Sequence, residues 1–318
     1  MDNIETRIYL FTGFLESGKT TFANDTIVNT NFCDGERTVM IITEEGEKEF
    51  DKNELKKHHT DLLLVETIQE LTQEAFWKKL KEEYHPTQVL VEFNGMWDVS
   101  AFINTVFPQG WDIVQILTTI DASKFAYYVN NANMRSYLFQ HCSQSDLIVF
   151  NRIENVKKTF MRNNIKAMNP RAQIIYENAD GSVDNSVDNG LPYDINAASI
   201  DVADHDFGIF CYDMMEHPEN YNHKHIRIKG KFIGKDSLRK DGFILGRYAM
   251  VCCEQDTSLI GLLCQNPASN QFIPNEWLIV EGDTTMDYDK DIGMNVITLH
   301  ADKIEGTTPL PYEYVTFD

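Results

Sequence analysis

The sequence is poor in basic residues. Its 318 residues include 28 lysines and arginines against 49 aspartates and glutamates, which gives a formal net charge of −21. A surface of this charge repels nucleic-acid phosphates and anionic lipids, so neither is an expected partner. The chain also lacks an apolar run near the roughly 20 residues that cross a bilayer, and Met1–Glu5 lacks the features of a signal peptide. We therefore expect a cytoplasmic protein with no direct membrane insertion.

Cysteine is also scarce. The six cysteines are Cys33, Cys142, Cys211, Cys252, Cys253 and Cys264. Their number and irregular spacing exclude a disulfide framework in a chain of this length, so reduced thiols are expected. A hydrophobic share of 42% is that of a globular protein, and the length favours two domains.

The most informative stretch is Gly13–Thr20, which matches the phosphate-binding pattern G-x-x-x-x-G-K-[ST]. It follows the apolar run Ile8–Phe11 and precedes a helix-compatible run, which is the context the motif requires. Glycines let backbone N–H groups turn toward a phosphate, and the helix start adds its positive dipole end. We expect Lys19 to reach the β- and γ-phosphates and the Thr20 hydroxyl to bind Mg²⁺. An accidental Gly-rich turn is the alternative, and the flanking elements disfavour it.

A second candidate element is the strand-like run Gln88–Gly95, which brings a carboxylate and then a glycine to its carboxyl end. Ligands of parallel α/β sheets bind at that edge. Glu92 would hold Mg²⁺, directly or through water, and the Gly95 N–H would sense the γ-phosphate. An ordinary glutamate after a strand is the alternative.

A third element, Asn151-Arg152-Ile153-Glu154, follows the apolar run Leu147–Phe150. The Glu154 carboxylate could accept hydrogen bonds from guanine N1–H and N2–H₂, while Asn151 braces the loop and Arg152 lies against the base. The alternative is a helix start with an acidic residue near its positive end. The strand-end position favours base recognition.

Two acidic stretches have simpler interpretations. Glu44–Asp51 lies where a switch loop would lie, and we favour a solvated charged loop over a metal site. The segment from Asn178 to Asp206 is rich in Asp, Asn, Ser and Gly, which predicts an acidic linker.

Together these motifs resemble the CobW-type family of P-loop GTPases, which includes metal-insertion and zinc-trafficking proteins. The resemblance covers roughly residues 5–178 and includes Thr118–Phe125 besides the three elements above. It implies a GTPase that uses GTP and Mg²⁺, with Lys19, Glu92 and Gly95 as catalytic residues. The expected nucleotide-binding residues are Gly13, Glu16, Ser17, Gly18, Lys19, Thr20, Thr21, Asn151, Arg152 and Glu154.

The sequence departs from the family pattern at two places. The family's C-x-C-C metal motif is replaced by the cysteine-free segment Val65–Leu71. Arg152 and Glu154 stand where the family usually has Lys and Asp. The first departure puts the family's thiolate metal site in question. The second changes two residues of the element that would recognise guanine, so it puts guanine specificity in question.

The second half contains several strand-like runs between turn residues, which predict a small OB-like barrel. It resembles the C-terminal domain of YcgQ-type proteins, which accompany a membrane permease, through His217–Tyr221, Gly246–Cys253 and Trp277–Gly282. The expected organisation is an α/β P-loop domain with a largely parallel sheet over 1–178, an acidic linker over 179–206 and a β-rich domain over 207–318.

Cys252 and Cys253 raise the question of zinc, which thiolates bind well. Cys264, His217, His223 and His225 could complete a tetrahedral site if the fold brought them close. Adjacent strand residues point to opposite faces, however, and free cysteines are usually buried. Structural cysteines are therefore favoured over zinc ligands.

Three functions are compatible with this sequence. The first is a Mg²⁺-dependent GTPase that drives delivery of a metal, with zinc expected, to a receiving protein, or that controls a membrane permease complex. The second is a nucleotide-gated adaptor with negligible hydrolysis. The third is an ATP-using P-loop enzyme, which Glu154 should disfavour by rejecting adenine.

Overall fold

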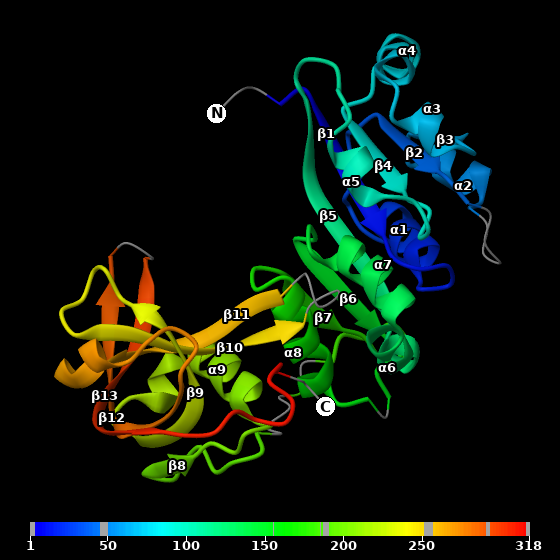
Figure 1. Cartoon of the computed structure of the whole chain (residues 1–318). Helices are drawn as coiled ribbons and strands as arrows, with labels where there is room; N and C mark the ends of the chain where they lie inside the picture. The colour runs from blue at the N-terminus through cyan, green and yellow to red at the C-terminus, as the bar shows by residue number, and fades with distance from the viewer. Residues whose placement is uncertain are drawn as a thin grey trace. The chain divides into compact units, whose positions relative to one another are not determined.

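The chain forms two compact units, each described here by itself (Figure 1). The computed structural model describes residues 4–44, 50–154, 156–184, 186, 191–250, 257–290 and 293–315. One unit comprises Met1–Met161 and Met168–Ser186, and the other comprises Arg162–Ala167 and Val187–Asp318. Among the described residues, no helix is long and apolar enough to cross a membrane.

The first unit is built on a seven-stranded sheet of order β3-β2-β4-β1-β5-β6-β7, in which all neighbouring strands are parallel. The strands are β1 (Thr6–Thr12), β2 (Thr38–Ile42), β3 (Thr60–Leu64), β4 (Gln88–Glu92), β5 (Trp111–Asp121), β6 (Leu147–Asn151) and β7 (Gln173–Tyr176). β1 lies between β4 and β5, so the strand order reverses beside it. In such sheets, ligands bind outside the carboxyl ends of the strands at this reversal.

Helices connect these strands. They are α1 (Lys19–Val28), α2 (Lys52–Lys57), α3 (Ile68–Leu71), α4 (Glu74–Tyr84), α5 (Val99–Ile103), α6 (Ala122–Asn130), α7 (Ala132–Cys142) and α8 (Lys158–Met168). The sequence predicts one helix over residues 123–140, but the structure has two. Asn131 ends α6 and caps α7, because its side chain accepts hydrogen bonds from Asn133 N and Met134 N.

The sheet is covered on both faces. Ile8 and Leu10 of β1 belong to one buried cluster, whereas Phe11 packs with Ala23 and Ile27 of α1 in another. Successive strand residues point to opposite faces. The continuous apolar strands of this sequence are therefore explained by a sheet that is buried on both sides.

The second unit is a closed five-stranded barrel in which neighbours follow the order β9-β10-β11-β13-β12 and back to β9. Its strands are β9 (His225–Lys235), β10 (Gly242–Met250), β11 (Thr257–Gln265), β12 (Trp277–Asp289) and β13 (Met294–Gly306). β11 and β13 pair in parallel, and the other pairs within the ring are antiparallel. This is the strand arrangement of an OB barrel, as expected from the sequence.

Further elements complete the second unit. They are β8 (Ser199–Asp201), α9 (Phe207–Glu216) and the 3₁₀ helices η1 (Pro218–Tyr221) and η2 (Pro267–Gln271). β8 pairs in parallel with β9, although it lies inside the segment that composition predicts to be a linker. Ile200 explains the difference, because it is 2% exposed and belongs to the barrel's core cluster.

Candidate functional site

The predicted phosphate loop connects β1 to α1 and has a strained backbone. Gly13, Glu16 and Gly18 have φ values of 128°, 61° and 99°. A Cβ atom on Gly13 would lie 2.3 Å from the Thr119 carbonyl oxygen, and one on Gly18 would lie 2.6 Å from Asn151 Nδ2. The loop therefore requires these glycines both for its turn and for its close packing against the ends of β5 and β6.

Lys19 is the first residue of α1, and its side chain is almost fully buried. Its ammonium group donates to the carbonyl oxygens of Gly13 and Phe14, each at 2.9 Å. It also forms an ion pair with Glu44, with Nζ and Oε1 2.6 Å apart. A phosphate that approached Lys19 would thus meet an ammonium group whose charge is already balanced by Glu44.

Thr20 and Glu92 meet beside Lys19. The Thr20 hydroxyl donates to Glu92 Oε1 at 2.5 Å. Glu92 is 3% exposed, and burial and the charge of Glu44 raise its pKa, while Thr20 and Lys19 act in the opposite direction. A hydroxyl and a carboxylate are the oxygen donors that Mg²⁺ uses next to nucleotide phosphates, so this pair fits that ion.

Gly95 lies directly against the phosphate loop. It is the second residue of a turn in which Trp97 N donates to the Asn94 carbonyl at 3.1 Å. A Cβ atom on Gly95 would lie 2.5 Å from the Gly13 carbonyl oxygen and 2.8 Å from Phe14 Cα. The turn after β4 therefore packs directly against the backbone of the predicted phosphate loop.

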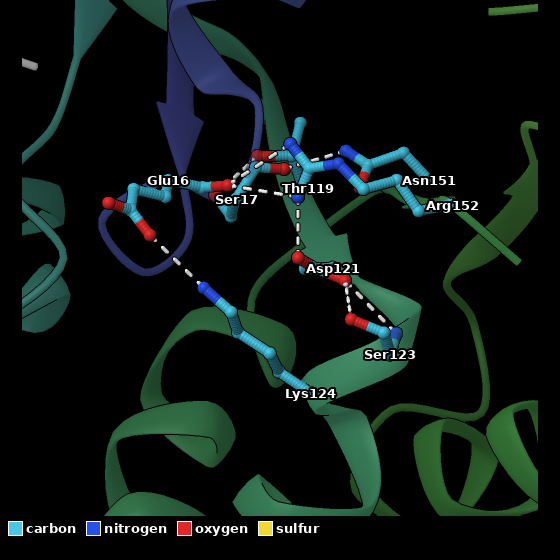
Figure 2. Close-up of polar contacts among 8 residues, drawn as sticks. All are labelled: Glu16, Ser17, Thr119, Asp121, Ser123, Lys124, Asn151 and Arg152. Atoms are coloured by element: carbon cyan, nitrogen blue, oxygen red, sulfur yellow. Dashed lines mark hydrogen bonds and ion pairs between the residues drawn. The ribbon is translucent and has the colours of Figure 1, made fainter. Parts of the chain in front are cut away.

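Asn151 connects the end of β6 to the same loop (Figure 2). Its Nδ2 donates to the Ser17 carbonyl at 2.7 Å, and the hydroxyls of Ser17 and Thr119 are 2.8 Å apart. The Asn151 Oδ1 atom is buried without a hydrogen-bond partner among the described residues. A buried acceptor without a partner lowers the free energy of unfolding unless a ligand supplies a hydrogen-bond donor.

Arg152 adopts a positive φ of 53° and points its guanidinium toward the loop. Nη1 lies 2.5 Å from Asp121 Oδ2 and 3.3 Å from the Glu16 carbonyl oxygen, as Figure 2 shows. Burial acts to raise the pKa of Asp121, but hydrogen bonds from Ser123 and Arg152 hold it below its usual value. The guanidinium is thus engaged by the protein, which leaves the aliphatic stem of Arg152 for a base.

A pocket of about 490 Å³ opens beside α1 and the ends of β5 and β6. Its lining residues are Gly18, Thr21, Phe22, Asp25, Thr26, Asn29, Thr30, Thr119, Asn151, Arg152, Glu177, Asn178, Ala179, Asp180 and Gly181. Close to this pocket, Glu154 Oε1 accepts a hydrogen bond from Ala179 N at 2.6 Å. A carboxylate acceptor and a backbone donor are therefore adjacent beside a cavity of ligand size.

The structure gathers most of the predicted site residues at one edge of the sheet. The loop Gly13–Thr20, Glu92, Gly95 and the element Asn151–Glu154 all lie at the carboxyl ends of β1, β4 and β6, and Thr21 lines the pocket. Glu16 contributes its carbonyl to Arg152, and its carboxylate pairs with Lys124 at 3.2 Å. The roles of these predicted site residues in binding a nucleotide stay predictions.

The residues considered as zinc ligands are only partly described by the structure. Cys252 and Cys253 lie outside the described residues. Cys264 is fully buried, and burial raises its pKa strongly. His225 instead contacts Asp283 at 2.8 Å and Glu281 at 3.2 Å. Across the part of the chain that the structure describes, no group of three or more His, Cys, Asp or Glu side chains could hold a metal ion.

Sequence reasoning missed several residues of this site. Asp121 lies in the segment Thr118–Phe125 that carries the family resemblance but was given no role of its own, and Ala179 lies in the predicted linker. His141 lies on α7 and contacts Gly95 from a distance of 46 residues along the chain. Strand-end position was a usable signal for Asp121, whereas the sequence holds no local signal for the other two.

A phosphate loop between β1 and α1, at the reversal point of a parallel sheet, defines a P-loop nucleotide-binding protein. The family model "CobW/HypB/UreG, nucleotide-binding domain" matches residues 7–176, and the chain belongs to this family of P-loop NTPases, which are generally GTPases. The model "DUF1980 C-terminal domain" matches residues 178–316. Both matches confirm the resemblances found in the sequence.

Solved structures with similarity to the chain include the hydrogenase maturation factor HypB from Archaeoglobus fulgidus. It is 18% identical, with 56% of this chain and 84% of that chain covered and a TM-score of 0.40. The small single-stranded DNA-binding protein from Streptomyces coelicolor is 15% identical over 26% of this chain and 93% of its own, with a TM-score of 0.19. No curated protein matches the chain.

Proposed function

We propose that this chain is a cytoplasmic Mg²⁺-dependent GTPase. The observation that carries the proposal is the contact between the Thr20 hydroxyl and the buried Glu92 carboxylate at 2.5 Å, next to the Lys19 ammonium. Phosphoryl transfer requires oxygen ligands for Mg²⁺, here Thr20 and Glu92, and a cation beside the phosphate loop, here Lys19. The family match supports the same assignment.

In this proposal, catalysis consists mainly of positioning and charge stabilisation. Lys19 and the loop N–H groups bind the β- and γ-phosphates, while Thr20 and Glu92 hold Mg²⁺. When bound, the ion neutralises charge that develops on the transferred group. Gly95 presents its N–H to the γ-phosphate from the turn that contacts Gly13 and Phe14.

Guanine selection would come from Glu154 and Ala179. The carboxylate and the N–H, which bond to each other at 2.6 Å, would each exchange that bond for one to the base. Guanine offers N1–H and N2–H₂ to Glu154 and its O6 acceptor to Ala179. Adenine presents the opposite donor and acceptor pattern at these positions, so the pair should reject it.

The first test is release of phosphate from GTP by the purified chain in the presence of Mg²⁺, with ATP as the comparison. We expect hydrolysis of GTP alone, and no hydrolysis by Lys19→Ala, because the substitution removes the cation that contacts the transferred phosphate. An unimpaired rate in Lys19→Ala would refute the assignment. Equal competition of ATP and GTP for binding would instead support the ATP-using enzyme.

A second candidate is a nucleotide-gated adaptor, and the ion pair between Lys19 and Glu44 favours it. A site whose lysine is already neutralised is suited to slow turnover that a partner accelerates. Stoichiometric GTP binding without phosphate release, followed by release when a partner is added, would support this candidate.

We propose that the downstream role is delivery of a metal such as zinc to a receiving protein, or control of a membrane permease. Support comes from membership of a family that takes its name partly from the hydrogenase maturation factor HypB. Calorimetric titration with Zn²⁺, for the wild type and for Cys252→Ser/Cys253→Ser, tests the metal. Zinc binding that survives the double substitution would exclude these thiols as ligands.

A further inference from the structure

The buried ring of His141 contacts two parts of the candidate site at once. It lies on α7, is 1% exposed and has hydrogen-bond partners on both ring nitrogens. Nε2 is 2.9 Å from the Gly95 carbonyl oxygen, and Nδ1 is 2.7 Å from Thr12 Oγ1. Thr12 is the last residue of β1, directly before the phosphate loop.

The chemistry of these partners assigns the proton. A carbonyl oxygen can only accept, so Nε2 carries the hydrogen in its bond to Gly95. Nδ1 of the neutral ring is then an acceptor, and the Thr12 hydroxyl must donate to it. His141 therefore connects the carbonyl group of Gly95, which belongs to the peptide unit between Gly95 and Met96, to the end of β1.

A third contact reaches the phosphate loop itself. The ring of His141 meets Phe14 edge-to-face, with ring centroids 5.6 Å apart and an interplanar angle of 79°. The Cα atom of Phe14 also lies so close to Gly95 that it leaves no room for a side chain at position 95. One imidazole thus touches the strand, the loop and the turn that together would enclose the γ-phosphate.

The backbone of His141 is also held by hydrogen bonds. The His141 carbonyl accepts from Ser145 Oγ at 2.7 Å and from Thr118 Oγ1 at 3.2 Å. Thr118 is in turn 3.3 Å from Thr12. These hydroxyls and the imidazole lie in one buried polar cluster, and hydrogen bonds in such clusters restrict the geometry of their members.

We propose that His141 is a positioning residue for recognition of the γ-phosphate, because its bond to the Gly95 carbonyl limits rotation of the Gly95 backbone and so restricts the orientation of the Gly95 N–H, which would bind that phosphate. This inference rests on the proposed function, in which Gly95 senses the third phosphate. The bond should matter for a nucleoside triphosphate and should not matter for the diphosphate, which does not reach Gly95.

Two amide substitutions separate the two bonds of the ring. A glutamine amide nitrogen can occupy the place of Nε2, so His141→Gln can still donate to the Gly95 carbonyl. An asparagine side chain is shorter and reaches only the place of Nδ1, so His141→Asn keeps a partner for Thr12 and loses Gly95. Ser145→Ala is the matched control, because it removes a hydroxyl that contacts His141 only at its backbone carbonyl and leaves both bonds of the ring nitrogens in place.

The experiment is calorimetric titration of the full chain and these variants with GDP and with a non-hydrolysable GTP analogue, both with Mg²⁺. We expect His141→Asn to weaken binding of the analogue about five- to tenfold while GDP affinity stays within about twofold. His141→Gln and Ser145→Ala should keep the wild-type ratio of the two affinities, and GDP binding shows that each variant is folded.

Two results would overturn the inference in distinguishable ways. If His141→Asn loses affinity for GDP and the analogue equally, or keeps the wild-type ratio, the residue supports the fold and does not position Gly95. If the wild type binds neither nucleotide, the proposed function fails and the role of His141 fails with it.

Discussion

Glu44 occupies the position beside Lys19 that a phosphate oxygen would take. The two side chains are 2.6 Å apart, and both are largely buried. A buried carboxylate of this kind must be displaced before an anionic phosphate can bind, since two anions compete for one ammonium group. If Lys19 binds the phosphates as proposed, Glu44 therefore competes with the nucleotide and sets part of its affinity.

Replacement of this carboxylate should increase nucleotide affinity. We expect Glu44→Gln to bind GDP and a GTP analogue about tenfold more tightly, because the competing charge is gone while the side-chain volume is kept. Calorimetry measures the change, and Glu54→Gln, which affects a surface pair with Lys57, should change nothing. Weaker binding by Glu44→Gln would mean that this carboxylate belongs to the bound site itself.

Burial of His141 should also make stability depend on pH. Burial and the charge of Lys19 lower its pKa from 6.5 to about 4, although its bond to Gly95 acts in the opposite direction. Between these values the unfolded chain binds a proton that the folded chain does not, so folding stability falls as pH decreases from 6.5 to 4. The expected loss is about 3 kcal/mol.

Denaturant unfolding at several pH values tests this expectation. The wild type should lose more stability between pH 6.5 and 4 than His141→Gln, whose amide does not titrate. Parallel curves for the two proteins would show that His141 is protonated in the folded state at the same pH as in the unfolded chain.

Sequence patterns located the residues of the site that form short motifs and missed those that act through distant contacts. Lys19, Thr20 and Glu92 follow from strand-end position and spacing. Ala179 and His141 carry no local pattern, because their partners Glu154 and Gly95 are 25 and 46 residues away in the chain. Such contacts depend on the strand order, which spacing alone does not give.

Gly282 shows how closely the strands of the barrel approach one another. It lies at an irregularity in the pairing of β12 with β13, and a Cβ atom there would be 2.0 Å from the His300 carbonyl oxygen and 2.8 Å from Ala301 Cα. Backbone atoms cannot move aside as a side chain can. This position therefore needs glycine for space and not for an unusual φ angle.

Gly282→Ala should destabilise the barrel by about 1–3 kcal/mol, the usual range for overpacking. Gly234→Ala is the matched control, because Gly234 lies in β9 with nothing within 4 Å of an added Cβ. Thermal unfolding should show a clear decrease in Tm for the first variant and almost none for the second. Equal Tm values would mean that the strands can separate without cost at the bulge.

The elements themselves were partly predictable. The buried strands and the barrel strands were found from apolar runs and turn residues, since these patterns reflect local burial. The division between α6 and α7 and the strand β8 were missed. Each of these depends on a single residue. Asn131 caps α7 within a run that reads as one helix, and Ile200 anchors β8 in the core within a segment whose composition indicates a linker.

The charge of the whole chain limits what the barrel can bind. OB barrels often bind oligonucleotides, but a net charge of −21 opposes contact with a phosphate backbone. We expect no change in the anisotropy of labelled oligo(dT) up to about 100 µM protein, the weak end of non-specific binding. The titration should be repeated in low salt, where attraction would be strongest, and saturable binding there would contradict the expectation.

The ring of barrel strands is not equally strong all the way around. Among the described residues, β12 and β13 pair from Leu278 to Asp289, whereas β11 and β13 pair from Leu263 to Gln265. Short pairings such as this one open before long ones, because fewer hydrogen bonds must break together. Backbone amides of the β11–β13 pair are therefore expected to exchange with solvent before those of the β12–β13 pair.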